Sequence, residues 1–180
     1  MNLSSLFIAS FLTNNIVLTH FLGISYENKN KKNMNAIIFI SIVLSSIFTY
    51  IINNFLENYI FLKIFISIFM VLLVILIIDL LTKKTFPKTY KDLKKALPFI
   101  VTNGTILGTT LLIDLKDYNF IEMLVFALGS ALGFILISEL INSINTKLKS
   151  NEIKGAFKGL PLILITLAIM SLIFSRFMSL

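Results

Sequence analysis

Six long apolar segments dominate this chain of 180 residues. Each segment is 18 to 23 residues long, enough for an α-helix to cross a hydrocarbon core of about 30 Å. Lipid offers no hydrogen bonds to exposed backbone groups, so such segments must be helical. We therefore predict an all-α integral membrane protein whose single membrane domain covers residues 1–180. The six expected transmembrane helices are Leu3–Leu22, Ala36–Phe55, Ile60–Leu81, Ala96–Ile113, Phe120–Asn142 and Leu160–Met178.

The composition leaves little material for a soluble domain, because 57% of the residues are hydrophobic and only 14% are charged. The first span lacks a basic leader and a small-residue cleavage site, so we expect it to remain in the mature protein. The net charge of +7 would suggest nucleic acid as a partner of a soluble chain, but lysines also gather on the cytoplasmic side of membrane proteins. We expect no nucleic-acid partner. The chain contains no cysteine, so it cannot by itself form a disulfide or a thiolate-held cluster.

The lysines predict the topology. Of the 16 basic residues, 13 lie in the first, third and fifth connections between the expected spans, whereas the second and fourth connections contain only Lys116. Positive residues favour the cytoplasmic side, so connections one, three and five should face the cytoplasm and both termini should lie outside. The 13 residues are Lys29, Lys31, Lys32, Lys83, Lys84, Lys88, Lys91, Lys94, Lys95, Lys147, Lys149, Lys154 and Lys158.

A short polar motif occurs once in each half of the chain, as Thr13-Asn14-Asn15 and, 89 residues later, as Thr102-Asn103-Gly104. Buried amides are costly in lipid, which favours a helix interruption at each motif. Three spans per half would place the second half in the opposite orientation. We therefore predict two inverted three-helix repeats, about 1–82 and 96–180, with interrupted first helices that meet at a working site.

Asn14, Asn15, Thr102 and Asn103 are candidates for this site because their amide and hydroxyl groups can coordinate an ion or support unwound backbone. Gly104 would allow a break in the helix or a close backbone approach. A purely structural interpretation remains open, in which these residues cap half-helices and form hydrogen bonds between spans.

Two carboxylates lie near the ends of spans. Asp79 and Glu139 are candidates for an ion pathway, although Asp79 could instead form a surface pair with Lys83, one helical turn further on. Gly129 and Gly133 form a pattern of small residues that favours close helix packing in the fifth span. The sequence shows no metal-ligand cluster, phosphate loop or nucleophile triad, so we expect no catalytic centre in this chain alone.

These residues resemble a known family, the small membrane subunits of the Rnf and Na⁺-translocating NADH:quinone reductase complexes, and most closely its A-type members. The double asparagine and the Leu-Pro…Thr-Asn element are the most specific parts, and the resemblance covers nearly the whole chain. The matching stretches are Asn14–Gly23, Lys84–Tyr90, Leu97–Gly108, Gly133-Phe134, Phe157–Gly159 and Ile165–Leu172.

The resemblance implies six spans in inverted repeats, and a role as one subunit of a complex that couples electron transfer to Na⁺ or H⁺ translocation across the bacterial cytoplasmic membrane. It implies other subunits of the complex as partners, especially an E-type paralogue of inverted topology. In the family, two cysteines from each of these two subunits hold a [2Fe–2S] cluster. Asp79 falls on an acidic position of the family, which strengthens it as an ion-pathway candidate.

This chain departs from the family at both cysteine positions, where it has Ser25 and Gly104. Because such clusters are usually held by four thiolates, we expect this chain to bind no cofactor alone. Two alternatives to the electron-transport role therefore stay open. The chain could be a transporter or channel on the same scaffold, or a structural subunit that has lost its electron-transfer role.

Overall fold

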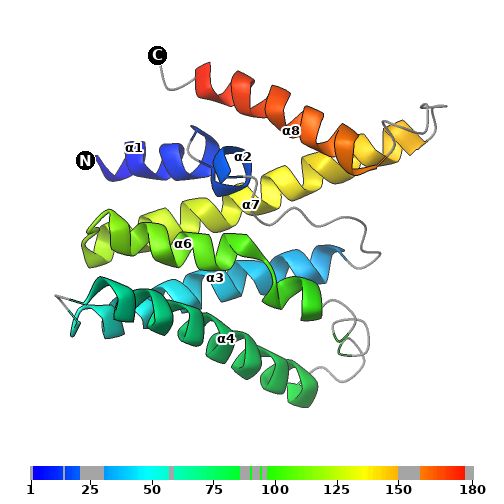
Figure 1. The fold of residues 1–180 in the computed structure, drawn as a ribbon. Helices are drawn as coiled ribbons and strands as arrows, with labels where there is room; N and C mark the ends of the chain where they lie inside the picture. The colour runs from blue at the N-terminus through cyan, green and yellow to red at the C-terminus, as the bar shows by residue number, and fades with distance from the viewer. Residues whose placement is uncertain are drawn as a thin grey trace.

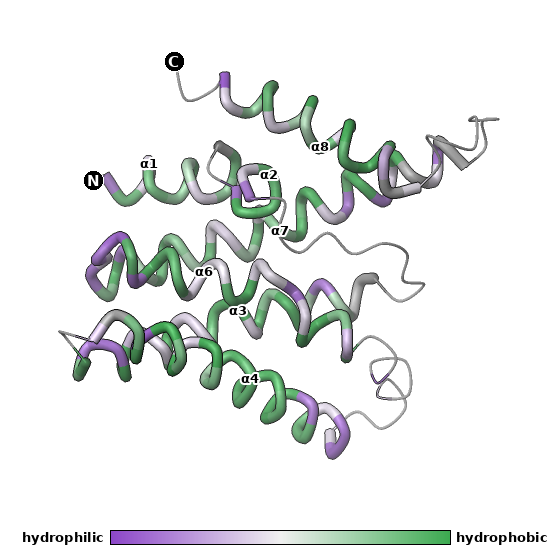
Figure 2. The backbone as a smooth tube through the Cα atoms, viewed as in Figure 1, coloured by the Kyte–Doolittle hydropathy of each residue, from purple (hydrophilic) through white to green (hydrophobic). Residues whose placement is uncertain are grey.

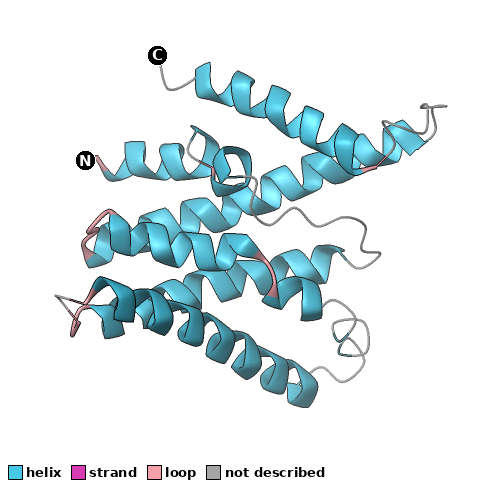
Figure 3. Ribbon diagram, viewed as in Figure 1, coloured by secondary structure: helices cyan, strands magenta, loops and turns pink. Residues whose placement is uncertain are grey.

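In the computed structural model, the described residues are 2–13, 15–20, 31–56, 59–85, 97–149 and 159–176, with Tyr90 and Lys94 as isolated positions. Every regular element in these ranges is a helix (Figure 3). The elements are α1 (Leu3–Ile8), the π-helix η1 (Ala9–Thr13), α2 (Ile16–His20), α3 (Lys31–Asn53), α4 (Ile60–Thr85), α6 (Gly104–Leu115), α7 (Phe120–Lys149) and α8 (Leu160–Ser175).

The predicted all-α membrane architecture is confirmed at the level of helix length and apolarity. Within the described residues, four helical segments are long and apolar enough to cross a membrane, fewer than the six expected. The first expected span is shortened because its helix breaks after Thr13, and the last because its described part ends at Arg176. The four long segments are Met34–Asn53, Phe61–Thr85, Leu97–Leu115 and Phe120–Ile144. The two shorter apolar ones are Leu3–Leu12 and Pro161–Ser175.

The main helices alternate in direction along the chain (Figure 1). In that view α1, α4 and α7 run from left to right, whereas α3, α6 and α8 run from right to left. The start of α1 and the end of α8 therefore lie on the left, together with the end of α3, the start of α4 and the turn from α6 to α7.

Helix α7 is the centre of the bundle, because it contacts α1, η1, α2, α3, α6 and α8. Helix α3 packs in turn between α7, α4 and α6. Apolar side chains from several helices fill the main core, including Leu18, Ile38, Ile42, Ile106 and Phe134. Their burial away from polar surroundings, together with close packing, holds the bundle together.

Helix α4 has the opposite character, because its outer face is apolar and uncovered. Phe61, Phe65 and Phe69 are 82%, 71% and 63% exposed, and the tube of α4 is hydrophobic over most of its length (Figure 2). A helix that is apolar on nearly all sides suits a position against lipid tails.

Candidate functional site

The first polar motif interrupts the first apolar segment. The π-helix ends at Thr13 and α2 begins at Ile16, and α2 is seen nearly end-on in Figure 1 whereas α1 lies across the view. Asn15 is buried at this break, with 1% of its surface exposed. Its Nδ2 donates to the Phe11 carbonyl at 2.9 Å, and its Oδ1 accepts from the Val17 backbone N–H at 3.0 Å. One amide thus satisfies backbone groups on both sides of the interruption.

The second motif interrupts the segment Leu97–Leu115 in the same way. Asn103 has an extended backbone (φ −71°, ψ 105°) at the N-terminus of α6. Its buried Oδ1 accepts from the Thr105 backbone N–H at 2.9 Å. Thr102 is exposed, and its hydroxyl donates to the Pro98 carbonyl at 2.8 Å. Gly104 follows as the first residue of the new helix.

The two breaks share one local geometry. In both, an asparagine oxygen accepts from the backbone N–H two residues further on, which is how a side chain caps a helix N-terminus. Capping is therefore an observed role of Asn15 and Asn103, and coordination of an ion by them stays a prediction. Asn14 and Ser25 lie outside the described residues.

The two breaks are joined through the core. Val17 and Leu18, just after the first break, belong to the same buried cluster as Ile100 and Ile106, which flank the second. Helices α2 and α6 also contact each other directly. The fold therefore brings together two motifs that lie 89 residues apart in the sequence.

Two glycines of α7 make room for the first break. A Cβ atom built on Gly129 would lie 3.0 Å from Ser10 Cβ and 3.1 Å from the Phe7 carbonyl oxygen. One built on Gly133 would lie 2.7 Å from the Phe11 carbonyl oxygen and 3.3 Å from Asn15 Cγ. The predicted close packing at these glycines is thus present, and its partner is the interrupted first helix.

Asp79 lies near the C-terminal end of α4, where it shares a small cavity of about 10 Å³ with Leu97 and Ile100. Its Oδ1 atom is buried and accepts no hydrogen bond. The carboxylate interacts with the Tyr90 phenol, and no ion pair joins it to Lys83, in contrast to the pairing that the sequence suggested. Partial desolvation raises the pKa of Tyr90 above 10.0, and the charge and hydrogen bond of Asp79 raise it further.

Glu139 is part of a bridge between α3 and α7. It accepts from Asn35 Nδ2 at 3.1 Å, and the Ser138 hydroxyl donates to Asn35 Oδ1 at 3.3 Å. Asn35 is buried, so these contacts satisfy an amide inside the bundle. In this arrangement Glu139 has a structural role, as the hydrogen-bond acceptor of the Asn35 amide.

Sequence reasoning missed a cavity of about 350 Å³ that Lys63 and Asp114 line together with several hydroxyl and amide side chains. The available signal was the line of Ser41, Ser45 and Thr49, four residues apart inside an apolar span. Such spacing places polar groups on one helix face, where they need partners.

A helical bundle with apolar outer surfaces and two asparagine-capped helix breaks defines the chain as a multi-pass membrane protein built on interrupted helices. A family model described as "Rnf-Nqr subunit, membrane protein" matches residues 3–180, so the chain belongs to this family. The predicted family resemblance is thereby confirmed.

Several relatives support the assignment. The chain is 29% identical to the A subunit of the Na⁺-translocating ferredoxin:NAD⁺ oxidoreductase complex of Acetobacterium woodii, over 98% of this chain and 97% of the relative. It is 36% identical to the A subunit of the ion-translocating oxidoreductase complex of Aliivibrio salmonicida, over 52% of this chain and 49% of the relative. The identity with the corresponding protein of Vibrio parahaemolyticus is 37% over the same shares.

The residues of this chain do not fit the thiolate-held cluster that the resemblance implies. The chain has no cysteine, and Gly104 offers no side-chain ligand at one of the two expected positions. Within the described ranges, His, Asp and Glu nowhere gather in a group of three that could hold a metal ion.

Proposed function

We propose that this chain is a membrane subunit of an Rnf-type complex, which couples electron transfer to ion translocation across the bacterial cytoplasmic membrane. The pair of buried asparagine caps, Asn15 and Asn103, carries the proposal, because helices interrupted at the membrane centre are where transported ions are handled in repeat-built transporters. The family and the names of the relatives supply the class of complex. The chain would act within that complex and not as an enzyme alone.

The proposed topology is two inverted three-helix repeats, about 1–82 and 96–180. Two observations support it. The first helix of each half, α1 and α6, runs in opposite directions in Figure 1, and the lysines gather in alternate connections. Connections one, three and five would then face the cytoplasm, and both termini would lie outside.

The mechanism that we propose is a change in how the interrupted helices pack. The N-termini of α2 and α6 carry partial positive charge, and the carbonyls before each break carry partial negative charge. A redox change elsewhere in the complex would shift these short segments against α7 and open access to one side of the membrane. Asn14, Asn15, Thr102 and Asn103 would border this switch, with Na⁺ or H⁺ as the transported ion.

Electron transfer would rely on partner subunits. Because Gly104 and Ser25 replace the thiolates of the family, we propose that this chain binds no iron–sulfur cluster alone. An E-type paralogue of inverted topology would pack beside it, and the apolar outer face of α4 would contact lipid or another protein of the complex.

The test is an affinity purification of the tagged chain from its own membranes in mild detergent, followed by mass spectrometry and by redox-driven ion uptake into vesicles. We expect the other subunits of the complex to co-purify with the wild-type chain. Asn15→Leu should reduce ion uptake strongly at normal protein levels, because it removes both bonds of the amide that bridges the break. Asn142→Leu makes the same exchange near the C-terminal end of α7, away from both helix breaks, and should leave ion uptake unchanged.

Other outcomes would separate the alternatives. Ion or solute flux through the isolated chain without redox partners would replace the proposal with a transporter or channel. Co-purification of the complex with normal ion uptake in Asn15→Leu vesicles would leave the chain only a structural role.

A further inference from the structure

One face of α4 carries an uninterrupted stripe of exposed apolar side chains. Its members follow one another at intervals of three or four residues, which places them on one side of an α-helix. Between 46% and 82% of each residue is exposed, and the members are Phe61, Phe65, Phe69, Leu72, Leu76 and Leu80. At 1.5 Å per residue the stripe is roughly 29 Å long, close to the thickness of about 30 Å of a hydrocarbon core. The stripe therefore spans the acyl-chain region of one bilayer.

The same face of α4 ends in two lysines. Lys83 and Lys84 follow Leu80 by three and four residues, so they continue the stripe beyond its apolar part. The helix runs on to Thr85, and both lysines are exposed on it. In Figure 2 this end of α4 changes from hydrophobic to hydrophilic. Two cations thus stand at the depth of the lipid headgroups, directly beside a surface suited to acyl chains.

The positive charge at this end of α4 is not offset by nearby carboxylates. Within the described part of the chain, neither Lys83 nor Lys84 forms an ion pair. The nearest acid in the sequence, Asp79, has its Oδ1 buried and interacts instead with the Tyr90 phenol. Residues 82–95, which begin at the end of α4, contain six lysines and one aspartate. An anion is therefore the ligand that this surface attracts.

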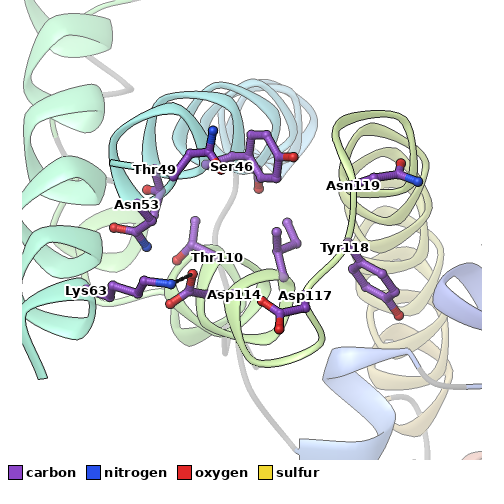
Figure 4. A pocket seen from close by; sticks show the side chains of 12 residues that line it. Ser46, Thr49, Asn53, Lys63, Thr110, Asp114, Asp117, Tyr118 and Asn119 are labelled. Carbon is purple, nitrogen blue, oxygen red and sulfur yellow. Dashed lines mark ion pairs between the residues drawn. The ribbon is translucent and has the colours of Figure 1, made fainter. Parts of the chain in front are cut away.

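The opposite end of α4 has a different charge balance. Its lysine, Lys63, pairs with Asp114 across 3.6 Å, and both line the cavity of about 350 Å³ together with Asp117 (Figure 4). Two carboxylates thus face one ammonium group at that end, so it has no cation to spare for an anionic ligand. The two ends of one lipid-facing helix are therefore distinguished by charge, and only the C-terminal end favours an anion.

We propose that the C-terminal end of α4 binds an anionic phospholipid, with Lys83 and Lys84 at its phosphate and its acyl chains along the apolar stripe. Clusters of lysines beside a membrane-spanning helix recognise anionic headgroups. The stripe consists of phenylalanine and leucine alone, whereas tight contacts between helices in membranes favour small residues such as Gly129 and Gly133 of α7. Lipid is thus a better occupant of this face than another protein. The site does not depend on the redox role of the complex, so it can be measured on this chain alone.

The experiment is native mass spectrometry of the purified full-length chain in a non-ionic detergent, with equal amounts of phosphatidylglycerol and phosphatidylcholine that carry the same acyl chains. The wild-type chain should retain phosphatidylglycerol in preference by about tenfold or more, because each lysine near the headgroup contributes several-fold. Lys83→Gln/Lys84→Gln should remove most of this preference, whereas Lys83→Arg/Lys84→Arg should keep it. The matched control is Lys147→Gln/Lys149→Gln, which removes the same charge from the end of α7, the central helix of the bundle, and should retain the preference.

Equal retention of the two lipids by the wild-type chain would overturn the proposal, as would an unchanged preference in Lys83→Gln/Lys84→Gln. If that variant fails to fold, the wild-type chain still decides the question, because a preference based on exposed charges must fall when NaCl rises from about 0.05 M to about 0.5 M.

Two further outcomes would assign the lysines to another ligand. Free glycerol phosphate that displaces the lipid at the lipid's own concentration would show a phosphate site without a role for the apolar stripe. Loss of other subunits from the purified complex in Lys83→Gln/Lys84→Gln, with unchanged lipid retention, would show an acidic protein surface as the partner. Either result would contradict the lipid site, and neither would contradict the proposed role of the chain in a redox complex.

Discussion

Gly133 of α7 lies directly against Asn15, the residue whose amide bridges the first helix break. A Cβ atom built on Gly133 would lie 3.3 Å from Asn15 Cγ, and Asn15 itself bonds to the Phe11 carbonyl and to the Val17 N–H. Gly133, in the fifth expected span, thus packs against the helix break in the first expected span. The absence of a side chain at residue 133 is what permits this contact.

Gly133→Ala should destabilise the protein by about 1–3 kcal/mol, because the added methyl group must displace either Asn15 or the Phe11 backbone. Thermal stability can be followed by size-exclusion chromatography of the tagged protein after heating, a method that needs neither tryptophan nor cysteine. Leu132→Ala, on the exposed face of the same helix, is the control and should have a smaller effect. Equal stability of Gly133→Ala and wild type would contradict the packing described for the break.

Asn103→Ala should cost about 0.5–2 kcal/mol, because it removes the side-chain acceptor of the Thr105 N–H in buried surroundings. Asn103→Asp keeps that acceptor and should recover most of the loss, and the same heating assay measures both variants. Asn103→Ser offers an independent check, since a serine hydroxyl can also cap a helix. Losses in the Asp and Ser variants as large as the loss in the Ala variant would refute the capping role.

Thr49→Val should raise thermal stability by about 1 kcal/mol, because it replaces a buried hydroxyl that has no partner with a methyl group of similar size. Thr166→Val removes a hydroxyl that has a partner and should not stabilise the protein. The measurement is the melting temperature of each variant, compared with that of the wild-type protein under identical conditions. A lower melting temperature for Thr49→Val than for wild type would mean that the Thr49 hydroxyl has a hydrogen-bond partner in the folded protein.

Tyr90 should ionise at a higher pH than an ordinary tyrosine, because partial desolvation and the nearby Asp79 carboxylate raise the pKa of its phenol above 10.0. The folded state then binds the phenol proton more tightly than the unfolded state. This contribution to stability is complete below pH 10 and is lost as the pH rises through the raised pKa. Asp79→Asn should shift the pKa of Tyr90 downward.

Phenolate absorbance of the folded protein, measured as the difference between wild type and Tyr90→Phe, gives the titration of this residue alone. The same difference in an Asp79→Asn background isolates the effect of the carboxylate. A Tyr90 titration that does not respond to Asp79→Asn would contradict the contact between α4 and the third connection.

Much of the helical architecture could be predicted from the amino-acid sequence. The end of α3 and the start of α7 agree closely with the expected spans, because runs of apolar residues in lipid have no alternative to a helix, whereas α3 begins at Lys31, five residues before the expected start at Ala36. Helix α4 continues to Thr85, past the expected end at Leu81, since lysines at a helix end can reach the interface while the backbone stays helical. The two helix breaks could be placed because asparagine competes for backbone groups locally.

The sequence by itself thus determined the helical class, the apolar segments and the positions of the two breaks, all of which depend on neighbours within a few residues. Tertiary structure alone decided that Gly133 would face Asn15, that the residues after both breaks would share one core cluster, and that residues of α3 would line one cavity with Asp114 and Lys63. These relationships depend on how helices far apart in the chain rotate and pack against one another, and no local pattern encodes that rotation.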